Sequence, residues 1–352
     1  MTEERELLRE AVRGLVATHP TPATLWSRLC KEIGVAGLTL PPAYDGSGAT
    51  LLESFAVLEE LGRTLTPTPM LPCLLAAEAL LLAGDAGSHL LPALCSGDLV
   101  ATVAFLPDAT VLPDAIVLPD ATATAEGDRL TGTATSVPNL EEAGTLLVLT
   151  GEALFEVPPE GVPEESLDLS RPLSTVHLAN TPARRLGTVS AATVRDIAAV
   201  ALGAEQIGAA ARALELTVDY AKTRHQFARP IGSFQAVQHR LADSHVRLQA
   251  ARATHEAAAE ALVAHAPDAP VLAAVAKVTC SEAFQSIAAD MTQVHGGIAI
   301  TWEHEAHRYL RRAWSSAHLF GSPADHITRL SDVLLGQGTD HPGAPTTSVR
   351  PQ

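Results

Sequence analysis

The chain has 352 residues, enough for two or three domains with substantial cores, and 47% of them are hydrophobic whereas only 4% are aromatic. The formal net charge of −16 argues against nucleic acid and anionic membranes as main partners, and the four cysteines match neither a zinc site nor a disulfide framework. With no secretory signal pattern and no apolar run of roughly 18 residues, the sequence predicts a soluble, cytoplasmic protein that binds neither nucleic acid nor membrane.

The first part of the chain has helical periodicity. Apolar residues recur at helical spacing from Leu8 to Val16, and two further helices are predicted for LLESFAVLEELGR (51–63) and PMLPCLLAAEALLLAG (69–84). Glycine, proline and aspartate separate these segments. The pattern therefore predicts an N-terminal helical domain over residues 1–98.

The pattern changes after residue 98. Short runs rich in valine and threonine, such as LVATVAFLP, DRLTGTATSV and TLLVLT, are bounded by proline, aspartate and glycine and predict a middle β domain over residues 99–188. Helical periodicity then returns and predicts a C-terminal helical bundle over 189–337, followed by a Pro/Gly/Thr-rich tail (338–352) that is predicted to be disordered. The expected fold is mainly α with a small β domain.

The segment RHQFARPIGSFQAVQHRLAD joins two of these helices with more hydrogen-bonding capacity than a spacer needs. The planar guanidinium group of Arg224 can bind a phosphate through two parallel hydrogen bonds. The side chains of Gln226 and Gln235, beside Phe227, can bind the edge of a heterocycle. These residues could hold a nucleotide; the alternative is the capping and solvation of an ordinary helix–helix turn.

A second group of residues lies in QVHGGIAITWEHEAHRYLRRA, which begins at Gln293. The backbone at Gly297 can approach a ligand closely because glycine has no side chain; the alternative is a glycine that ends a helix. His304 and His307 are three residues apart, but no second cluster of carboxylates or thiolates accompanies them. The sequence therefore predicts no metal site.

Three segments, in order, resemble the acyl-CoA dehydrogenase family. LCKEIGVAGLTLPPAYDGSG with LLESFAVLEELGR resembles its first helices, and YAKTRHQFARPIGSFQAVQHRLAD and QVHGGIAITWEHEAHRYLRRA resemble its two C-terminal signatures. The resemblance covers nearly the whole chain. It implies an N-terminal helical domain, a middle β domain and a C-terminal four-helix bundle, assembled as a tetramer of paired subunits. It also implies FAD as cofactor, an acyl-CoA substrate and electron-transfer flavoprotein as acceptor.

The resemblance also implies which residues bind the cofactor. In the family, the joint between the two bundle helices reaches into the neighbouring subunit's site. The FAD contacts that this implies are Arg224 at the pyrophosphate, Gln226, Phe227 and Gln235 along the adenosine half, and Gln293 with Gly297 completing the contact.

Two departures from the family pattern lie in the middle domain. The loop that hydrogen-bonds the flavin is replaced by FLPDATVLPDA (105–115), and the tryptophan-containing segment that touches the flavin ring is replaced by TSVPN (135–139). These departures argue against binding of the isoalloxazine ring by this chain's own β domain.

A further departure concerns the carboxylate that removes the α-proton of the thioester. The two positions at which family members carry this glutamate hold Phe320 and Ala198, and the nearest carboxylate on the same helix face as Ala198 is Glu205. Its small apolar neighbours predict that burial raises the pKa of Glu205, as a base working near neutral pH requires. Glu205 is therefore the predicted catalytic residue; the alternative is an interhelical hydrogen bond or salt bridge.

The sequence thus predicts FAD-dependent α,β-dehydrogenation of an acyl-CoA thioester by one subunit of a heterotetramer, paired with a second acyl-CoA dehydrogenase-like chain. A tetramer of identical chains is the alternative assembly. Family members with such paired chains act on steroid-side-chain CoA thioesters, so fatty-acid or steroid side-chain β-oxidation is the expected setting. Two other functions stay open: a non-catalytic structural subunit that completes a partner's FAD site, and a flavoenzyme acting on a carrier-bound acyl group.

Overall fold

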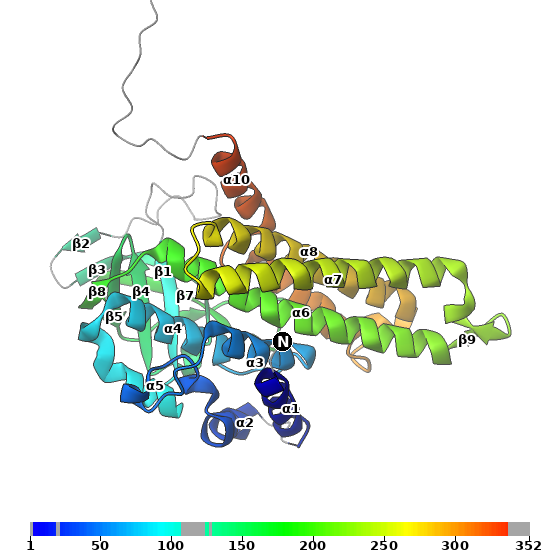
Figure 1. Cartoon of the computed structure of the whole chain (residues 1–352), viewed down its shortest axis with the longest axis horizontal. Helices are drawn as coiled ribbons and strands as arrows, with labels where there is room; N and C mark the ends of the chain where they lie inside the picture. The colour runs from blue at the N-terminus through cyan, green and yellow to red at the C-terminus, as the bar shows by residue number, and fades with distance from the viewer. Residues whose placement is uncertain (1–2, 19–21, 107–123, 127–128, 337–352) are drawn as a thin grey trace, which may run out of the picture.

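The computed structural model describes residues 3–18, 22–106, 124–126 and 129–336, which form an N-terminal helical region, a β region and a long helical bundle (Figure 1). The mainly helical architecture with a small β domain is therefore confirmed. The predicted tail and most of the segment FLPDATVLPDA lie outside the described residues.

The N-terminal region is built from helices α1 (Glu3–Thr18), α2 (Pro22–Arg28), α3 (Leu51–Arg63), α4 (Met70–Ala83) and α5 (Leu91–Ser96). Ion pairs attach α1 to α3, because Arg9 Nη1 lies 2.6 Å from a carboxylate oxygen of Glu59 and Arg13 Nη2 lies 2.9 Å from one of Glu60. Helix α3 is thereby held between α1 and the bundle, where it can contact both.

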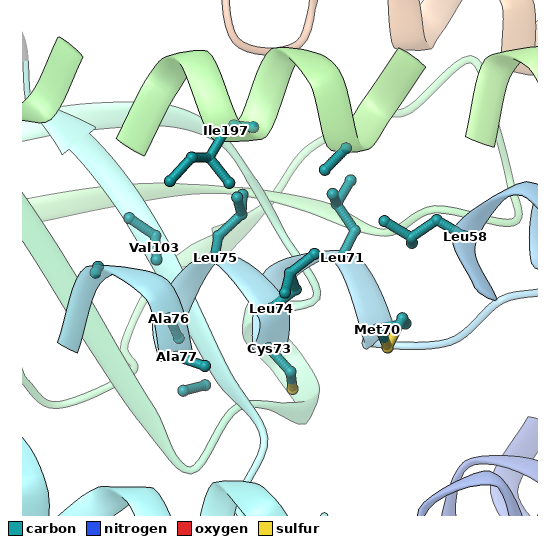
Figure 2. Packing of buried hydrophobic residues seen from close by; sticks show 14 of the residues in the cluster. Leu58, Met70, Leu71, Cys73, Leu74, Leu75, Ala76, Ala77, Val103 and Ile197 are labelled. Carbon is teal, nitrogen blue, oxygen red and sulfur yellow. The ribbon is translucent and has the colours of Figure 1, made fainter. Parts of the chain in front are cut away.

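Helix α4 is apolar on every side because other elements surround it. Figure 2 shows Leu71 and Leu75 of α4 beside Leu58 of α3, Val103 of strand β1 (Ala101–Leu106) and Ile197 of helix α6 (Ala191–Thr223), each at most 5% exposed. Full burial of a leucine side chain contributes about 1.5–3 kcal/mol to folding. One continuous core therefore joins all three regions.

The β region consists of two sheets that pack face to face. One sheet has the strand order β1–β4–β5–β8 and the other the order β2–β3–β7–β6. Strands β1 and β4 are parallel, and the other neighbouring strands are antiparallel. The remaining strand bounds are β2 (Thr124–Glu126), β3 (Arg129–Pro138), β4 (Thr145–Thr150), β5 (Ala153–Val157), β6 (Val162–Pro163), β7 (Leu173–Pro182) and β8 (Arg184–Thr188).

The bundle contains α6 together with α7 (Gln235–Val263), α8 (Ala269–His295), α9 (Ala306–His318) and α10 (Pro323–Leu334). Helix α6 crosses α3 at very short range through two glycines. A Cβ at Gly62 would lie 2.1 Å from the carbonyl oxygen of Glu205, and one at Gly208 would lie 1.8 Å from that of Glu59. Only glycine allows the two backbones to approach this closely.

Two bundle helices are long and apolar enough to cross a membrane by length and composition alone. They span Ala191–Thr223 and Ala269–Ile300, and 94% and 56%, respectively, of their most apolar windows are buried inside the protein. Their apolar character is explained by their packing, since α6 lies at the centre of the bundle and α8 packs along it.

A buried lysine connects α8 to the end of α9. The Lys277 side chain is fully buried, and its ammonium group donates hydrogen bonds to the carbonyl oxygens of Ser316 (3.4 Å) and Ala317 (2.9 Å) and to the hydroxyl of Ser281 (3.1 Å). These three partners are uncharged, and burial lowers the pKa of Lys277 to about 7.

We expect the free energy of unfolding to rise between about pH 7 and pH 9 in the wild type relative to Lys277→Met. In this interval the unfolded chain keeps a proton on Lys277 that the folded chain releases, so stability rises by roughly 1 kcal/mol per pH unit. Below about pH 7 the lysine is charged in both the folded and the unfolded state, so it does not make the free energy of unfolding depend on pH. Urea unfolding over this range tests the expectation, with the exposed Lys222→Met as control; parallel profiles for the wild type and Lys277→Met would contradict it.

Candidate functional site

The first sequence-predicted residues lie on a hairpin at the tip of the bundle. Strand β9 (His225–Gln226) pairs with β10 (Arg229–Pro230), and the two residues of the turn, Phe227 and Ala228, have φ angles of 52° and 62°. Non-glycine residues rarely adopt this left-handed conformation. The turn holds the Phe227 side chain 88% exposed, and Arg224 and Gln226 are exposed beside it.

The hairpin is attached to the start of α7 by an aromatic contact. The guanidinium carbon of Arg229 lies 3.9 Å from the centre of the Phe234 ring, a cation–π contact, and Phe234 directly precedes α7. Gln235 is the first residue of that helix and is also exposed. The joint is therefore an ordered structure that presents its polar side chains to solvent.

The remaining predicted contacts lie where α8 ends. Gly296 has a φ of 65° and ends the helix, and the turn η7 (Gly296–Ile300) follows, with Gln293 and Gly297 exposed on either side of the helix end. The ring of His295 stacks on that of Tyr220 in the last turn of α6, with 4.3 Å between ring centres.

The structure thus brings the six sequence-predicted FAD contacts to one end of the bundle, far from the β region (Figure 1). We call this surface the bundle end; it comprises Arg224, Gln226, Phe227, Gln235, Gln293 and Gly297. The bundle end combines a guanidinium group, three amide side chains, an aromatic ring and a glycine backbone. This donor set suits a nucleotide with a pyrophosphate and a heterocyclic base.

Glu205 lies elsewhere, in a buried cluster of charges at the middle of α6. Its carboxylate accepts hydrogen bonds from Arg171, in the segment before β7, and from Arg312 of α9. Arg312 also pairs with Asp168, and its Nη2 donates to Ser170 Oγ at 2.8 Å. We call Asp168, Arg171, Glu205 and Arg312 the ion network; it ties the β region to α6 and α9.

The ion network corrects the pKa expected for Glu205. Burial alone raises the pKa of this carboxyl group, but Arg171 and Arg312 outweigh burial, and the pKa lies below its usual value. The expectation of a raised pKa was therefore wrong, and the salt bridge that was the alternative for Glu205 is present. A carboxylate held by two arginines is a weak base, because it must break charge-assisted hydrogen bonds to take a proton.

Sequence reasoning missed the partners of Glu205. Arg171 ends the short motif DLSR, and Arg312 belongs to RRA in α9, where it lies on the same buried face as Tyr309 and Ser316. The helical spacing of Arg312 from these buried neighbours could have indicated that Arg312 is buried as well. A charged residue on a buried helix face requires a partner of opposite charge.

A cavity of about 20 Å³ adjoins the ion network, and Asn139, Arg171, Glu205 and Arg312 line it. Asn139 ends the segment TSVPN, which the resemblance assigns to the place of the family's flavin-contacting segment. A space of this size holds about one water molecule. Within the described residues, Arg171 Nη1 has no hydrogen-bond partner, so a water is the fitting occupant. The cavity does not fit a three-ring flavin.

Ala198 and Phe320, which the resemblance assigns to the two positions of the family's glutamate, have hydrocarbon side chains in apolar surroundings. Ala198 is fully buried in α6, and the Phe320 ring packs edge-on against Phe105 with 5.9 Å between ring centres. Among the residues that the structure describes, no group of three or more His, Cys, Asp or Glu side chains could hold a metal ion.

Two family models match the chain: the acyl-CoA dehydrogenase N-terminal domain over residues 2–98 and the acyl-CoA dehydrogenase C-terminal domain over residues 187–335. Acyl-CoA dehydrogenase IpdE2 of Mycobacterium tuberculosis is 39% identical, across 94% of this chain and 98% of its own. The protein of the same name from Mycolicibacterium smegmatis is 37% identical with the same coverage.

Two solved structures agree with the similarity to acyl-CoA dehydrogenases. A steroid ACAD named Tcur3481-Tcur3483 superposes with a TM-score of 0.87 at 32% identity, covering 95% of this chain and 98% of that one. The ChsE4-ChsE5 complex from Mycobacterium tuberculosis superposes with a TM-score of 0.85 at 28% identity, covering 97% and 99%. With similarity of this extent in both sequence and structure, the chain belongs to the acyl-CoA dehydrogenase family.

Proposed function

We propose that this chain is one subunit of a heteromeric, FAD-dependent acyl-CoA dehydrogenase and that its bundle end completes the flavin site of a dehydrogenase-like partner chain. The observation that carries the proposal is the separation of the two sites. Eighteen residues of α6 lie between Glu205 and the helix end at Thr223, which corresponds to about 27 Å along the helix. The bundle end therefore lies far from this chain's own ion network.

The chemistry of the bundle end supports its role toward a partner's cofactor. Arg224 can neutralise a pyrophosphate, and the exposed amides of Gln226, Gln235 and Gln293 can bind the adenosine half. Their exposure in the single chain leaves them free to contact a ligand held by another subunit. When bound, FAD supplies the acceptor for the hydride that leaves the β-carbon of the acyl group.

The interior of this chain supports the second half of the proposal, that the isoalloxazine ring and the base belong to the partner. Asn139 of TSVPN lines a water-sized cavity beside the ion network, and this cavity has no room for a flavin ring. Phe320 and Ala198 occupy the family's positions for the base. The role of Glu205 as base stays a prediction, which its two arginine partners disfavour.

The similarity to structures named as a steroid ACAD and as the ChsE4-ChsE5 complex supports a paired assembly and a steroid-side-chain CoA thioester as substrate. Electron-transfer flavoprotein is the proposed acceptor. The packing of the two long apolar helices within the bundle supports action in the cytoplasm.

The experiment that tests this function is expression of the chain alone and together with a dehydrogenase-like chain from the same genome. We expect the chain alone to lack flavin absorbance, and the co-purified complex to hold one FAD for each pair of chains and to oxidise acyl-CoA. Native mass spectrometry and the flavin absorbance of each species give the result. A yellow tetramer of this chain alone with full dehydrogenase activity would refute the heteromeric assembly.

A further inference from the structure

The ring of His295 is fixed in two directions. It is 5% exposed, and its Nδ1 lies 2.8 Å from the carbonyl oxygen of Met291 one turn earlier in α8. A carbonyl oxygen can only accept, so Nδ1 carries the proton in this contact. The face of the ring stacks on Tyr220 with an angle of 23° between the planes, and His304 lies against it with 4.6 Å between ring centres.

This stack joins the two halves of the bundle end. Tyr220 is connected directly to the first half, because its carbonyl oxygen accepts a hydrogen bond from the backbone N–H of Arg224 at 2.8 Å. His295 lies in the second half, between Gln293 and Gly297. The ring contact is therefore a short path from Arg224 to Gln293 of α8 and to Gly297 of the turn that follows.

The turn after His295 is anchored at its far end by Ala299, which is fully buried, whereas its two glycines have few neighbours. Within the described residues, a Cβ built on Gly296 or Gly297 would meet nothing within 4 Å. His304 also contacts the His295 ring and is itself fixed, because its Nδ1 accepts a hydrogen bond from the backbone of Ala306 at 3.1 Å. The orientation of Gly296 and Gly297 consequently depends on the ring that precedes them and on the buried Ala299 that follows.

We propose that His295 is a positioning residue for flavin binding: its ring, stacked on Tyr220, sets the spacing between Arg224 and the pair Gln293 and Gly297. This inference rests on the proposed function of the bundle end as an FAD contact. His295 holds the contacting groups in place and need not touch the cofactor itself.

The test uses the co-purified complex, stripped of flavin and titrated with FAD. Because His295→Ala removes an aromatic contact and a hydrogen bond, it should weaken FAD binding about tenfold or more. His295→Phe keeps the ring and should recover most of the affinity. Tyr220→Ala should give a similar loss, and the double variant His295→Ala/Tyr220→Ala should lose less than the sum of the two.

The control is His326→Ala, which removes a histidine that is equally buried (4% exposed) in α10 at a different place in the bundle. It should lower the melting temperature without changing FAD affinity.

The proposal is overturned if His295→Phe binds FAD as weakly as His295→Ala, or if the losses at His295 and Tyr220 simply add. Arg224→Ala in the same titration distinguishes failure of the proposed function from failure of this inference. Normal FAD binding by Arg224→Ala would reject the flavin role of the bundle end. Weakened FAD binding by Arg224→Ala together with unchanged binding by His295→Ala would reject only the positioning role of His295.

Discussion

Glu205→Gln should destabilise the protein by about 3–5 kcal/mol, because it leaves Arg171 and Arg312 buried with only Asp168 to neutralise them. Glutamine has nearly the same shape as glutamate, so the loss reports the charge and not the packing. Urea unfolding of the purified chain, monitored by circular dichroism, measures the effect.

The matched control is Glu215→Gln on the same helix. Glu215 also pairs with two arginines, Arg63 at 2.7 Å and Arg212 at 3.4 Å, but its side chain is 45% exposed. Because solvent screens exposed pairs, this variant should cost less than about 1 kcal/mol. Equal effects of the two substitutions would contradict the structural role assigned to the ion network.

The same variant also tests Glu205 as the catalytic base. Loss of a base lowers the rate by about 10²–10⁴-fold. Suppose that Glu205→Gln keeps the wild-type stability and FAD content, but that acyl-CoA reduces its flavin at such a lowered rate. Glu205 is then the base, and its main role is not to hold the ion network together. If assembled Glu205→Gln reduces its flavin at the wild-type rate, the base lies on the partner chain, as we propose.

Arg224→Ala should weaken FAD binding by the assembled complex by about 10- to 100-fold. Hydrogen bonds to charged groups contribute about 1.5–3 kcal/mol, and a phosphate that loses its arginine loses this contribution. The stability of the chain itself should change little, because Arg224 is exposed. Equilibrium titration with FAD, followed by flavin fluorescence, gives the affinity.

The control for Arg224 is Lys222→Ala, which removes a cation two residues earlier. The Lys222 side chain is 69% exposed and lies 3.4 Å from Asp219, so it shares the charge and location of Arg224 without belonging to the bundle end. A purely electrostatic effect of net charge would weaken FAD binding equally in both variants. FAD binding of wild-type strength in Arg224→Ala would reject the assignment of this arginine to the pyrophosphate.

Local sequence patterns determined most of the fold. The predicted helix at 69–84 is α4 (Met70–Ala83), and that at 51–63 coincides with α3 (Leu51–Arg63). The change to short valine- and threonine-rich runs marked the β strands. These features depend on residues within one or two turns of each other, so periodicity and turn residues are sufficient to predict them.

The sequence by itself also determined which residues belong to the two C-terminal signatures, because these are contiguous motifs. The tertiary structure brings the joint in the first motif and the beginning of the second to one end of the bundle, a placement that depends on how α6, α7 and α8 run back and forth. The stack of His295 on Tyr220 joins residues 75 positions apart in the chain, and no local pattern indicates it.

The environment of Glu205 was decided by tertiary structure alone. Its helical neighbours are small and apolar, and from them the sequence predicted burial, which is present. The sign of its pKa shift depends on arginines 34 and 107 positions away in the chain. Burial and nearby positive charge act in opposite directions on a carboxyl group, so the outcome follows from which charges the fold brings to it.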